Sequence, residues 1–116
     1  MDGMDVRNDL PVACSLSAAE LRARGEENLA LFSQAQRIRE LADGYAFAFA
    51  GADAVTELLL RFVLAERACC PFWSFELTLA SPHQEVWVSV RGNEEAKALV
   101  REGLVAKLTA PATPGA

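Results

Sequence analysis

The sequence has little that would take the chain into a membrane or out of the cell. Its longest apolar stretch, residues 58–65, is interrupted by Arg61 and falls well short of the roughly 18 residues that cross a bilayer. The first nine residues are polar and acidic, unlike a secretory signal. These absences predict a cytoplasmic protein that does not enter a membrane.

Clusters of positive charge are also missing. The chain has 11 Lys and Arg against 16 Asp and Glu, a net charge of −5 and a pI near 4.8. Its basic residues are scattered and mostly stand beside a glutamate, as in Arg39-Glu40 and Arg101-Glu102. Binding to a phosphate backbone or an anionic membrane surface requires clustered Lys and Arg. Nucleic acid and membranes are therefore not expected as direct partners.

Catalytic motifs are absent as well. The sequence contains one histidine, His83, and neither a Ser/His/Asp set, a Gly-rich phosphate loop nor an H-E-x-x-H motif. Its three cysteines are an odd number, and a cytoplasmic compartment keeps thiols reduced. A disulfide framework is excluded, and catalysis is not supported.

At 116 residues the chain is long enough for one domain. We expect a flexible arm over residues 1–10, a single domain over 11–108 and a disordered tail over 109–116. The apolar periodicities predict six elements in the order α-β-α-β-β-α: a helix from Ser17 to about Ala42, a strand over 45–50, a helix from Asp53 to near Cys70, strands over 73–79 and 86–91, and a helix from Asn93 to Leu108. This order predicts an α+β fold with a largely antiparallel three-stranded sheet, a ferredoxin-like variant. A fourth strand over Pro11–Ser15 remains an alternative.

Several local expectations follow from the same patterns. Ser17 and Glu20 have the spacing of a capping box, and Asp53 and Asn93 are expected to cap the later helices. The alanines at 46, 48 and 50 form one face of the strand over 45–50, and a close-packed helix is expected over that face. The second helix should direct a stripe inward, made of Val55, Leu58, Leu59, Phe62 and Val63.

The most informative segment is Glu66-Arg67-Ala68-Cys69-Cys70-Pro71-Phe72. At helical spacing Glu66 shares a face with Leu59 and Phe62, the seam expected to face the core. A buried carboxylate without a partner is costly, so Glu66 needs an arginine, a backbone donor or a metal ion. Arg67 points elsewhere on the helix.

Two adjacent thiols at a helix end can hold one soft ion. Neighbouring helical residues diverge by about 100°, so such a site depends on a distortion near Pro71. Cys14 would bring a third thiolate, with Glu66 or His83 as further ligands and Arg67, Phe72 and Trp73 around them. Sulfur ligands of this kind suit Cu(I), Zn(II), Hg(II) or arsenite.

Other interpretations remain open. Cysteine is often a small buried hydrophobe, so Cys69 and Cys70 are equally compatible with core packing in a protein-interaction module. Cys14 could pair with either one in a redox switch. The two cysteines lie at a helix C-terminus, where the dipole disfavours a thiolate nucleophile. Trp87, off the valine face of its strand, would mark a ligand or subunit contact if exposed, and a homodimer is one possible assembly.

The segment ERACCPFWSFELTL, residues 66–79, resembles a motif of small uncharacterised bacterial proteins, E-R-x-C-C-P-F-x-x-F-x-L. These proteins also begin with a Cys-x-Leu-Ser element before a long helix, as Cys14-Ser15-Leu16-Ser17 does here. The chain departs from the pattern at Gly92-Asn93, where Gly-Pro is expected. The family occurs alone or near heavy-metal-responsive regulators of the MerR type. The resemblance implies soft-metal handling, as an accessory to heavy-metal resistance or in contact with such a regulator.

Overall fold

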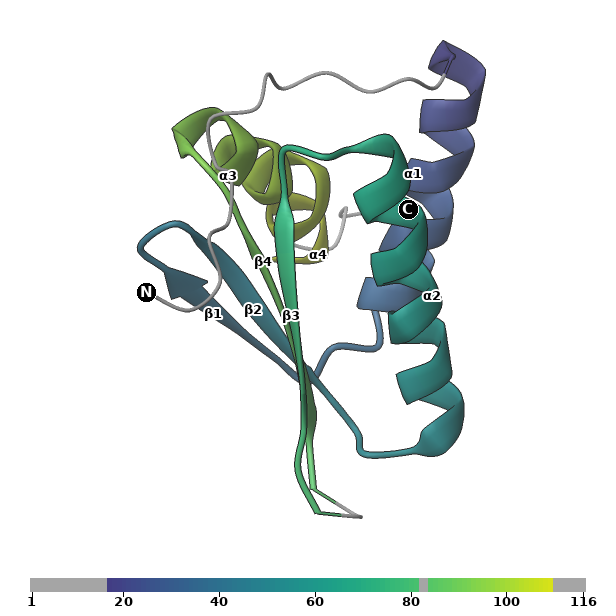
Figure 1. Cartoon of the computed structure of the whole chain (residues 1–116), viewed down its shortest axis with the longest axis vertical. Helices are drawn as coiled ribbons and strands as arrows, with labels where there is room; N and C mark the ends of the chain where they lie inside the picture. Colours follow the sequence, from purple (N-terminus) through teal and green to yellow (C-terminus); the bar gives the residue numbers. More distant parts are fainter. Residues whose placement is uncertain (1–16, 82–83, 110–116) are drawn as a thin grey trace, which may run out of the picture.

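The computed structural model describes residues 17–81 and 84–109 (Figure 1). The arm predicted over 1–10, the strand considered over Pro11–Ser15 and the tail from residue 110 lie outside the described residues. Thr109, which was assigned to that tail, ends the last helix. The elements in chain order are α1 (Ala18–Phe32), β1 (Arg37–Leu41), β2 (Gly44–Phe49), α2 (Asp53–Cys69), β3 (Ser74–Leu79), β4 (Val86–Arg91), α3 (Glu94–Val100), the π-helical segment η1 (Arg101–Val105) and α4 (Ala106–Thr109).

The four strands form one antiparallel sheet in the order β1-β2-β4-β3. β2 and β3 run in the same direction with β4 between them, so β2-α2-β3 is a split β-α-β unit of the ferredoxin-like kind. The predicted α+β class and antiparallel sheet are confirmed. β2 pairs with β4, the second strand of the hairpin.

The first predicted helix is too long. It ends at Phe32 instead of Ala42, and the segment Arg37–Leu41 forms β1, the edge strand beside β2. Ile38 and Leu41 fit a helical stripe, but they also fit a strand whose Ile38 pairs with Phe47. Pairing with β2 is the stronger influence because it packs Ile38 against the core cluster.

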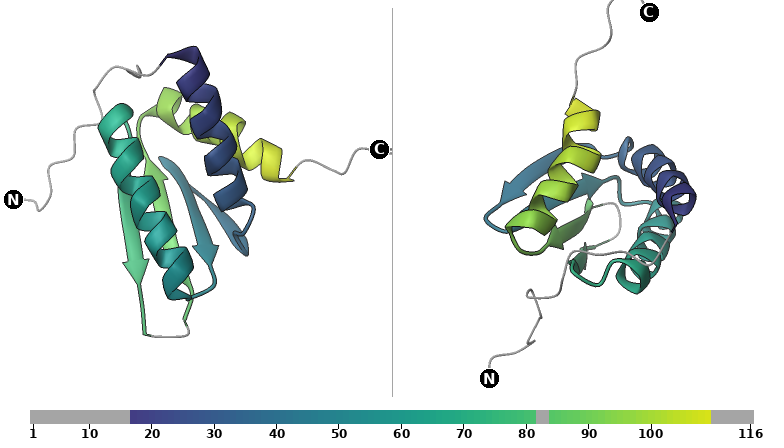
Figure 2. Two further views of the ribbon diagram at one scale, coloured as in Figure 1. Left: turned by 90° about the vertical axis from the view of Figure 1, so that its right-hand side faces the viewer. Right: turned by 90° about the horizontal axis from the view of Figure 1, so that it is seen from above.

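The helices cover one face of the sheet (Figure 2). The core contains the aromatic side chains of β2 and the valines of β4. Phe47, Phe49 and Val88 are fully buried there. No helix covers the alanine face within the described residues, which corrects that expectation. Instead Trp87 lies on this face, half-buried, with the guanidinium carbons of Arg37 and Arg39 at 5.4 and 4.7 Å from its ring.

The capping box of Ser17 and Glu20 is present, and the Asn93 side chain accepts from the Ala96 amide as predicted. Asp53 is the first residue of α2 and not its cap: the cap position is held by Ala52, which has no side-chain bond. Leu58 was expected to point inward but is 46% exposed, since it lies on the flank of the stripe formed by Leu59 and Phe62.

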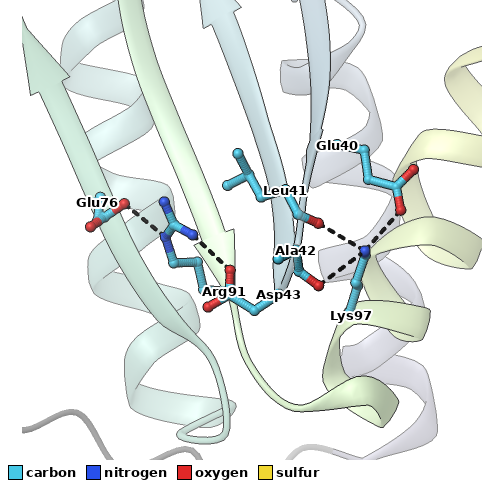
Figure 3. Close-up of polar contacts among 7 residues, drawn as sticks. All are labelled: Glu40, Leu41, Ala42, Asp43, Glu76, Arg91 and Lys97. Atoms are coloured by element: carbon cyan, nitrogen blue, oxygen red, sulfur yellow. Dashed lines mark hydrogen bonds and ion pairs between the residues drawn. The ribbon is translucent and has the colours of Figure 1, made fainter.

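Two basic side chains connect β1 and the turn between β1 and β2 to the rest of the fold through hydrogen bonds and ion pairs (Figure 3). Lys97 of α3 donates to Glu40 Oε2 and to the carbonyl oxygen of Leu41, both at 2.8 Å. Arg91 of β4 bonds Asp43 in the turn at 2.6 Å and Glu76 of β3 at 2.9 Å. The edge strand is thus tied to α3, β4 and β3. None of the helices in the described ranges is both long and apolar enough to pass through a bilayer.

Candidate metal centre

The site is built on the C-terminal end of α2. Glu66 is buried on the same face as Leu59 and Phe62, as predicted. The helix ends at Cys69, and Cys70 follows with φ −128° and ψ 74°, outside the helical region, while its amide still donates to the Glu66 carbonyl at 2.7 Å. Pro71 favours this departure because it excludes helical geometry at the residue before it.

This change of direction brings the two neighbouring thiols together. Cys69 Sγ and Cys70 Sγ are 3.4 Å apart, and Cys69 Sγ lies 3.3 Å from Glu66 Oε2. The three candidate ligand atoms lie within 4.8 Å of one another. Cys70 and Glu66 are buried, with 6% and 5% of their surface exposed, and Cys69 is half-buried. The group is compact enough to hold a single ion.

The partners of the buried carboxylate come from α1, which sequence reasoning did not find. Asn28 Nδ2 donates a hydrogen bond to Glu66 Oε1, and Arg24 Nη2 lies 3.7 Å from Glu66 Oε2. Arg24 and Asn28 are four residues apart and therefore share one face of α1. That spacing is the only signal in the sequence, and it does not by itself indicate which helix the face meets.

A pocket of about 170 Å³ opens beside the thiols. Glu66, Cys69 and Cys70 form one part of its wall, and Arg24 and Asn28 another. Most of the remaining wall is apolar and comes from α1, α2, the residue before β3, and the segment from α3 to η1: Leu21, Phe62, Trp73, Leu99, Val100 and Leu104. The thiols therefore face a small, largely apolar space that lies between the helices.

Two glycines also line this pocket, Gly25 from α1 and Gly103 from η1. A Cβ at either position would have no other atom within 4 Å. Gly103 lies in a π-helical turn inside an otherwise α-helical segment, and such single turns occur frequently at functional sites. The parts of the wall that come from α1 and η1 thus combine missing side chains with a widened helix.

The residues expected around the ligands divide into three groups. Trp73 lines the pocket and donates from Nε1 to the Ala96 carbonyl at 2.9 Å. Phe72 packs with Cys70 and Ala96 in a small buried cluster. Arg67 is exposed and does not line the pocket. The candidate ligands Cys14 and His83 lie outside the described residues.

Comparison of the chain with protein-family models, with curated proteins and with solved structures finds no match in any of the three.

Proposed function

We propose that this chain binds a thiophilic ion through the thiolates of Cys69 and Cys70, with Cys14 as a third sulfur ligand. The observation that carries the proposal is the approach of two thiols and a buried carboxylate to within 4.8 Å at the wall of a pocket. Sulfur-rich sites favour Cu(I), Zn(II), Hg(II) and arsenite over the hard ions that carboxylates alone would attract.

The position of the thiols at the C-terminal end of α2 supports this proposal over a hydrolytic or nucleophilic role. A thiolate at the end of α2 is opposed by the helix dipole and by Glu66, so it gains most from a bound cation that neutralises it. Arg24 and Asn28 hold the carboxylate in place from α1. A carboxylate fixed in this way would orient the thiol of Cys69 in the manner of the outer partners that position metal ligands.

The proposal assigns Glu66 as a ligand or as the immediate hydrogen-bond partner of one. His83, as a weaker donor from the turn between β3 and β4, is not required. In the cell such a protein would serve as buffer, carrier or accessory in heavy-metal resistance, as the resemblance of the Glu66–Leu79 segment implies.

The test is a titration of the reduced protein with Hg(II), Cu(I), Zn(II) and arsenite, followed by the ultraviolet absorbance of sulfur bound to the ion. We expect one ion per chain with a Kd below 1 μM, on the order of −8 kcal/mol or better. Cys69→Ser and Cys70→Ser should each abolish binding of the ion, and Cys14→Ser should weaken it.

A matched control is Ser74→Ala, which removes a hydroxyl four residues after Cys70 at a position that does not line the pocket, and leaves both thiols in place. Unchanged binding in the two serine variants of Cys69 and Cys70 would refute the proposal. In that case an intramolecular disulfide under mild oxidant would favour the redox switch, and its absence would favour the interaction module.

A further inference from the structure

The distance between the two sulfurs limits the geometry of the ion they can share. Consider one atom bonded to both sulfurs at about 2.3 Å. With the sulfurs 3.4 Å apart, the angle between its two bonds to sulfur is about 95°. A tetrahedral centre would need sulfurs about 3.8 Å apart, and a linear centre about 4.6 Å. The spacing therefore suits a centre that prefers angles near 90°.

Trivalent arsenic is such a centre. Its lone pair occupies one side, its three bonds form a pyramid, and the angles between those bonds are close to a right angle. Two of the three bonds can be made by Cys69 and Cys70 without moving their sulfurs. The third bond then points away from the dithiol.

The surroundings of the thiols indicate what the third bond carries. The adjoining pocket has a volume of about 170 Å³ and mostly apolar walls, and an apolar cavity of roughly 150 Å³ in another protein binds benzene. Water finds few hydrogen-bond partners in such a space. An aryl or short alkyl group is stabilised there because its apolar surface is removed from solvent. A bare ion would leave the pocket unused.

We propose that the ligand of this site is a trivalent arsenical with one organic group, its arsenic bonded by Cys69 and Cys70 and its organic group held in the pocket lined by Leu99 and Leu104. This inference rests on the proposed function and names the chemical class of the ligand. It assigns a role to the apolar walls and to the missing side chains at Gly25 and Gly103, which a bare ion does not need.

The binding step balances without an oxidant or a reductant. The hydrated ligand is R–As(OH)₂, and each thiol exchanges its proton for a bond to arsenic. Two As–O bonds break, two As–S bonds form, and two water molecules leave. Glu66 Oε2 lies 3.3 Å from Cys69 Sγ, a position from which it can accept that thiol's proton and return it to the departing hydroxyl.

The experiment compares phenylarsine oxide with arsenite on the reduced full chain, each in competition with dithiothreitol, a dithiol that has no pocket. Burying one aromatic group predicts that the protein prefers the phenyl compound over arsenite by a factor on the order of ten to a hundred more than dithiothreitol does. Mass spectrometry should show one phenylarsenic group gained and two protons lost.

Two variants locate the preference. Leu99→Ala shortens a pocket wall and should lower the affinity for the phenyl compound by roughly threefold to tenfold, with arsenite affected less than twofold. Leu60→Ala is the matched control, because Leu60 is a similarly exposed leucine that does not line the pocket. Cys14→Ser should weaken the binding of arsenite and leave the binding of the phenyl compound unchanged, because the third bond of that arsenic is already to carbon.

The outcomes separate this inference from the proposed function. If the protein binds arsenite, Hg(II), Cu(I) or Zn(II) but shows no preference for the phenyl compound beyond that of dithiothreitol, the inference is overturned and the function stands. An equal loss in Leu99→Ala and Leu60→Ala would also overturn it. If no thiophilic ion binds at all, both fail.

Discussion

Asn28 is the residue on which the buried carboxylate of Glu66 most directly depends. Glu66 is 5% exposed, and its Oε1 accepts a hydrogen bond from Asn28 Nδ2. Asn28→Leu should therefore lower the free energy of unfolding by about 1–3 kcal/mol, the cost of leaving a buried acceptor without its donor. Urea unfolding followed by circular dichroism measures it.

The matched control for this substitution is Glu27→Leu, at an exposed position of the same helix. It places a leucine at the neighbouring position of α1 without touching the carboxylate, and it changes helix propensity little because Glu and Leu are similar helix formers. The coupling is tested in the Glu66→Leu background, where the cost of Asn28→Leu should nearly vanish. An undiminished cost in that background would mean that Asn28 stabilises the protein through something other than Glu66.

The same substitution, glycine to alanine, should have opposite effects on stability at two positions. A Cβ on Gly44 would lie 1.9 Å from the Val90 carbonyl oxygen, whereas a Cβ on Gly25 meets nothing within 4 Å. Gly44→Ala should therefore cost about 3 kcal/mol, because the clash is with backbone that pairs β2 to β4. Gly25→Ala should raise stability by about 0.5–1 kcal/mol, as expected within a helix. Thermal unfolding of both variants checks the pair, and equal effects would contradict it.

At the residue scale, the sequence predicts the site residues that are close together in the chain and does not predict those that come from a distant segment. Glu66 on an apolar seam and two cysteines before a proline can be predicted, since all lie within one helical turn. Asn28 is 38 residues from Glu66, and its contact depends on where α1 crosses α2. Crossings of this kind are set by packing that the chain's local pattern does not encode.

Lys97 is the main link between α3 and the edge strand β1. Its ammonium donates to Glu40 and to the carbonyl oxygens of Leu41 and Ala42 (Figure 3). Lys97→Met keeps the length of the side chain and removes these bonds, so we expect a loss of about 1–3 kcal/mol. Lys107→Met, at an exposed position of α4, should change the free energy of unfolding by less than about 0.5 kcal/mol.

Hydrogen exchange gives a more local measurement of the same contact. The amides of β1 and of its turn should exchange faster in Lys97→Met, while those of β4 should keep their protection. Equal loss of protection across the whole sheet would mean that Lys97 stabilises the fold globally and does not act on the edge strand.

The same contact makes stability depend on pH. The hydrogen bond from Lys97, and then its positive charge, lower the pKa of Glu40 below the ordinary 4.5. A carboxyl with a lowered folded-state pKa contributes stability above its unfolded value and loses it as the pH falls through the folded value. The difference in unfolding free energy between the wild type and Glu40→Gln should be constant near pH 6 and decrease as the pH falls below 4.5. A difference that stays constant as the pH falls below 4.5 would contradict this origin.

The edge strand shows why elements are harder to predict than motifs. Leu41-Ala42-Asp43-Gly44-Tyr45 contains Asp-Gly between apolar runs, a strong hairpin signal, and it was interpreted as the end of a helix. Ile38 and Leu41 are three residues apart, which suits a helix continuing from Phe32. The strand forms because Ile38 pairs with Phe47 in β2, and this pairing outweighs a weak local preference.

At the scale of the whole molecule, the topology converts a short motif into a site. The split β-α-β unit fixes α2 against the sheet, and the segment from α3 through η1 returns across the same face. α1 and η1 line the pocket beside the thiols together with the end of α2. The doublet could be predicted from sequence, but the pocket could not, because its walls come from segments up to 83 residues apart, from Leu21 to Leu104.

This arrangement makes thermal stability a measure of the pocket. Cys69 and Cys70 are adjacent in the chain, so the unfolded protein keeps a dithiol that can also hold an arsenical. The two arsenic–sulfur bonds can form in both the folded and the unfolded protein, so their free energy does not stabilise the fold. Only contacts that require the folded structure raise the melting temperature. A tenfold preference contributed by the pocket is about 1.4 kcal/mol, which corresponds to roughly 5–10 °C in a domain of this size.

We therefore expect phenylarsine oxide to raise the melting temperature of the Cys14→Ser variant by several degrees, and arsenite to raise it much less. Leu99→Ala should reduce the shift and Leu60→Ala should preserve it, while the double variant Cys69→Ser/Cys70→Ser should show none. Differential scanning calorimetry at saturating ligand measures all of these. Tight binding of the phenyl compound with no rise in melting temperature would mean that the folded structure adds nothing to the dithiol, because the unfolded chain would then hold the ligand equally well.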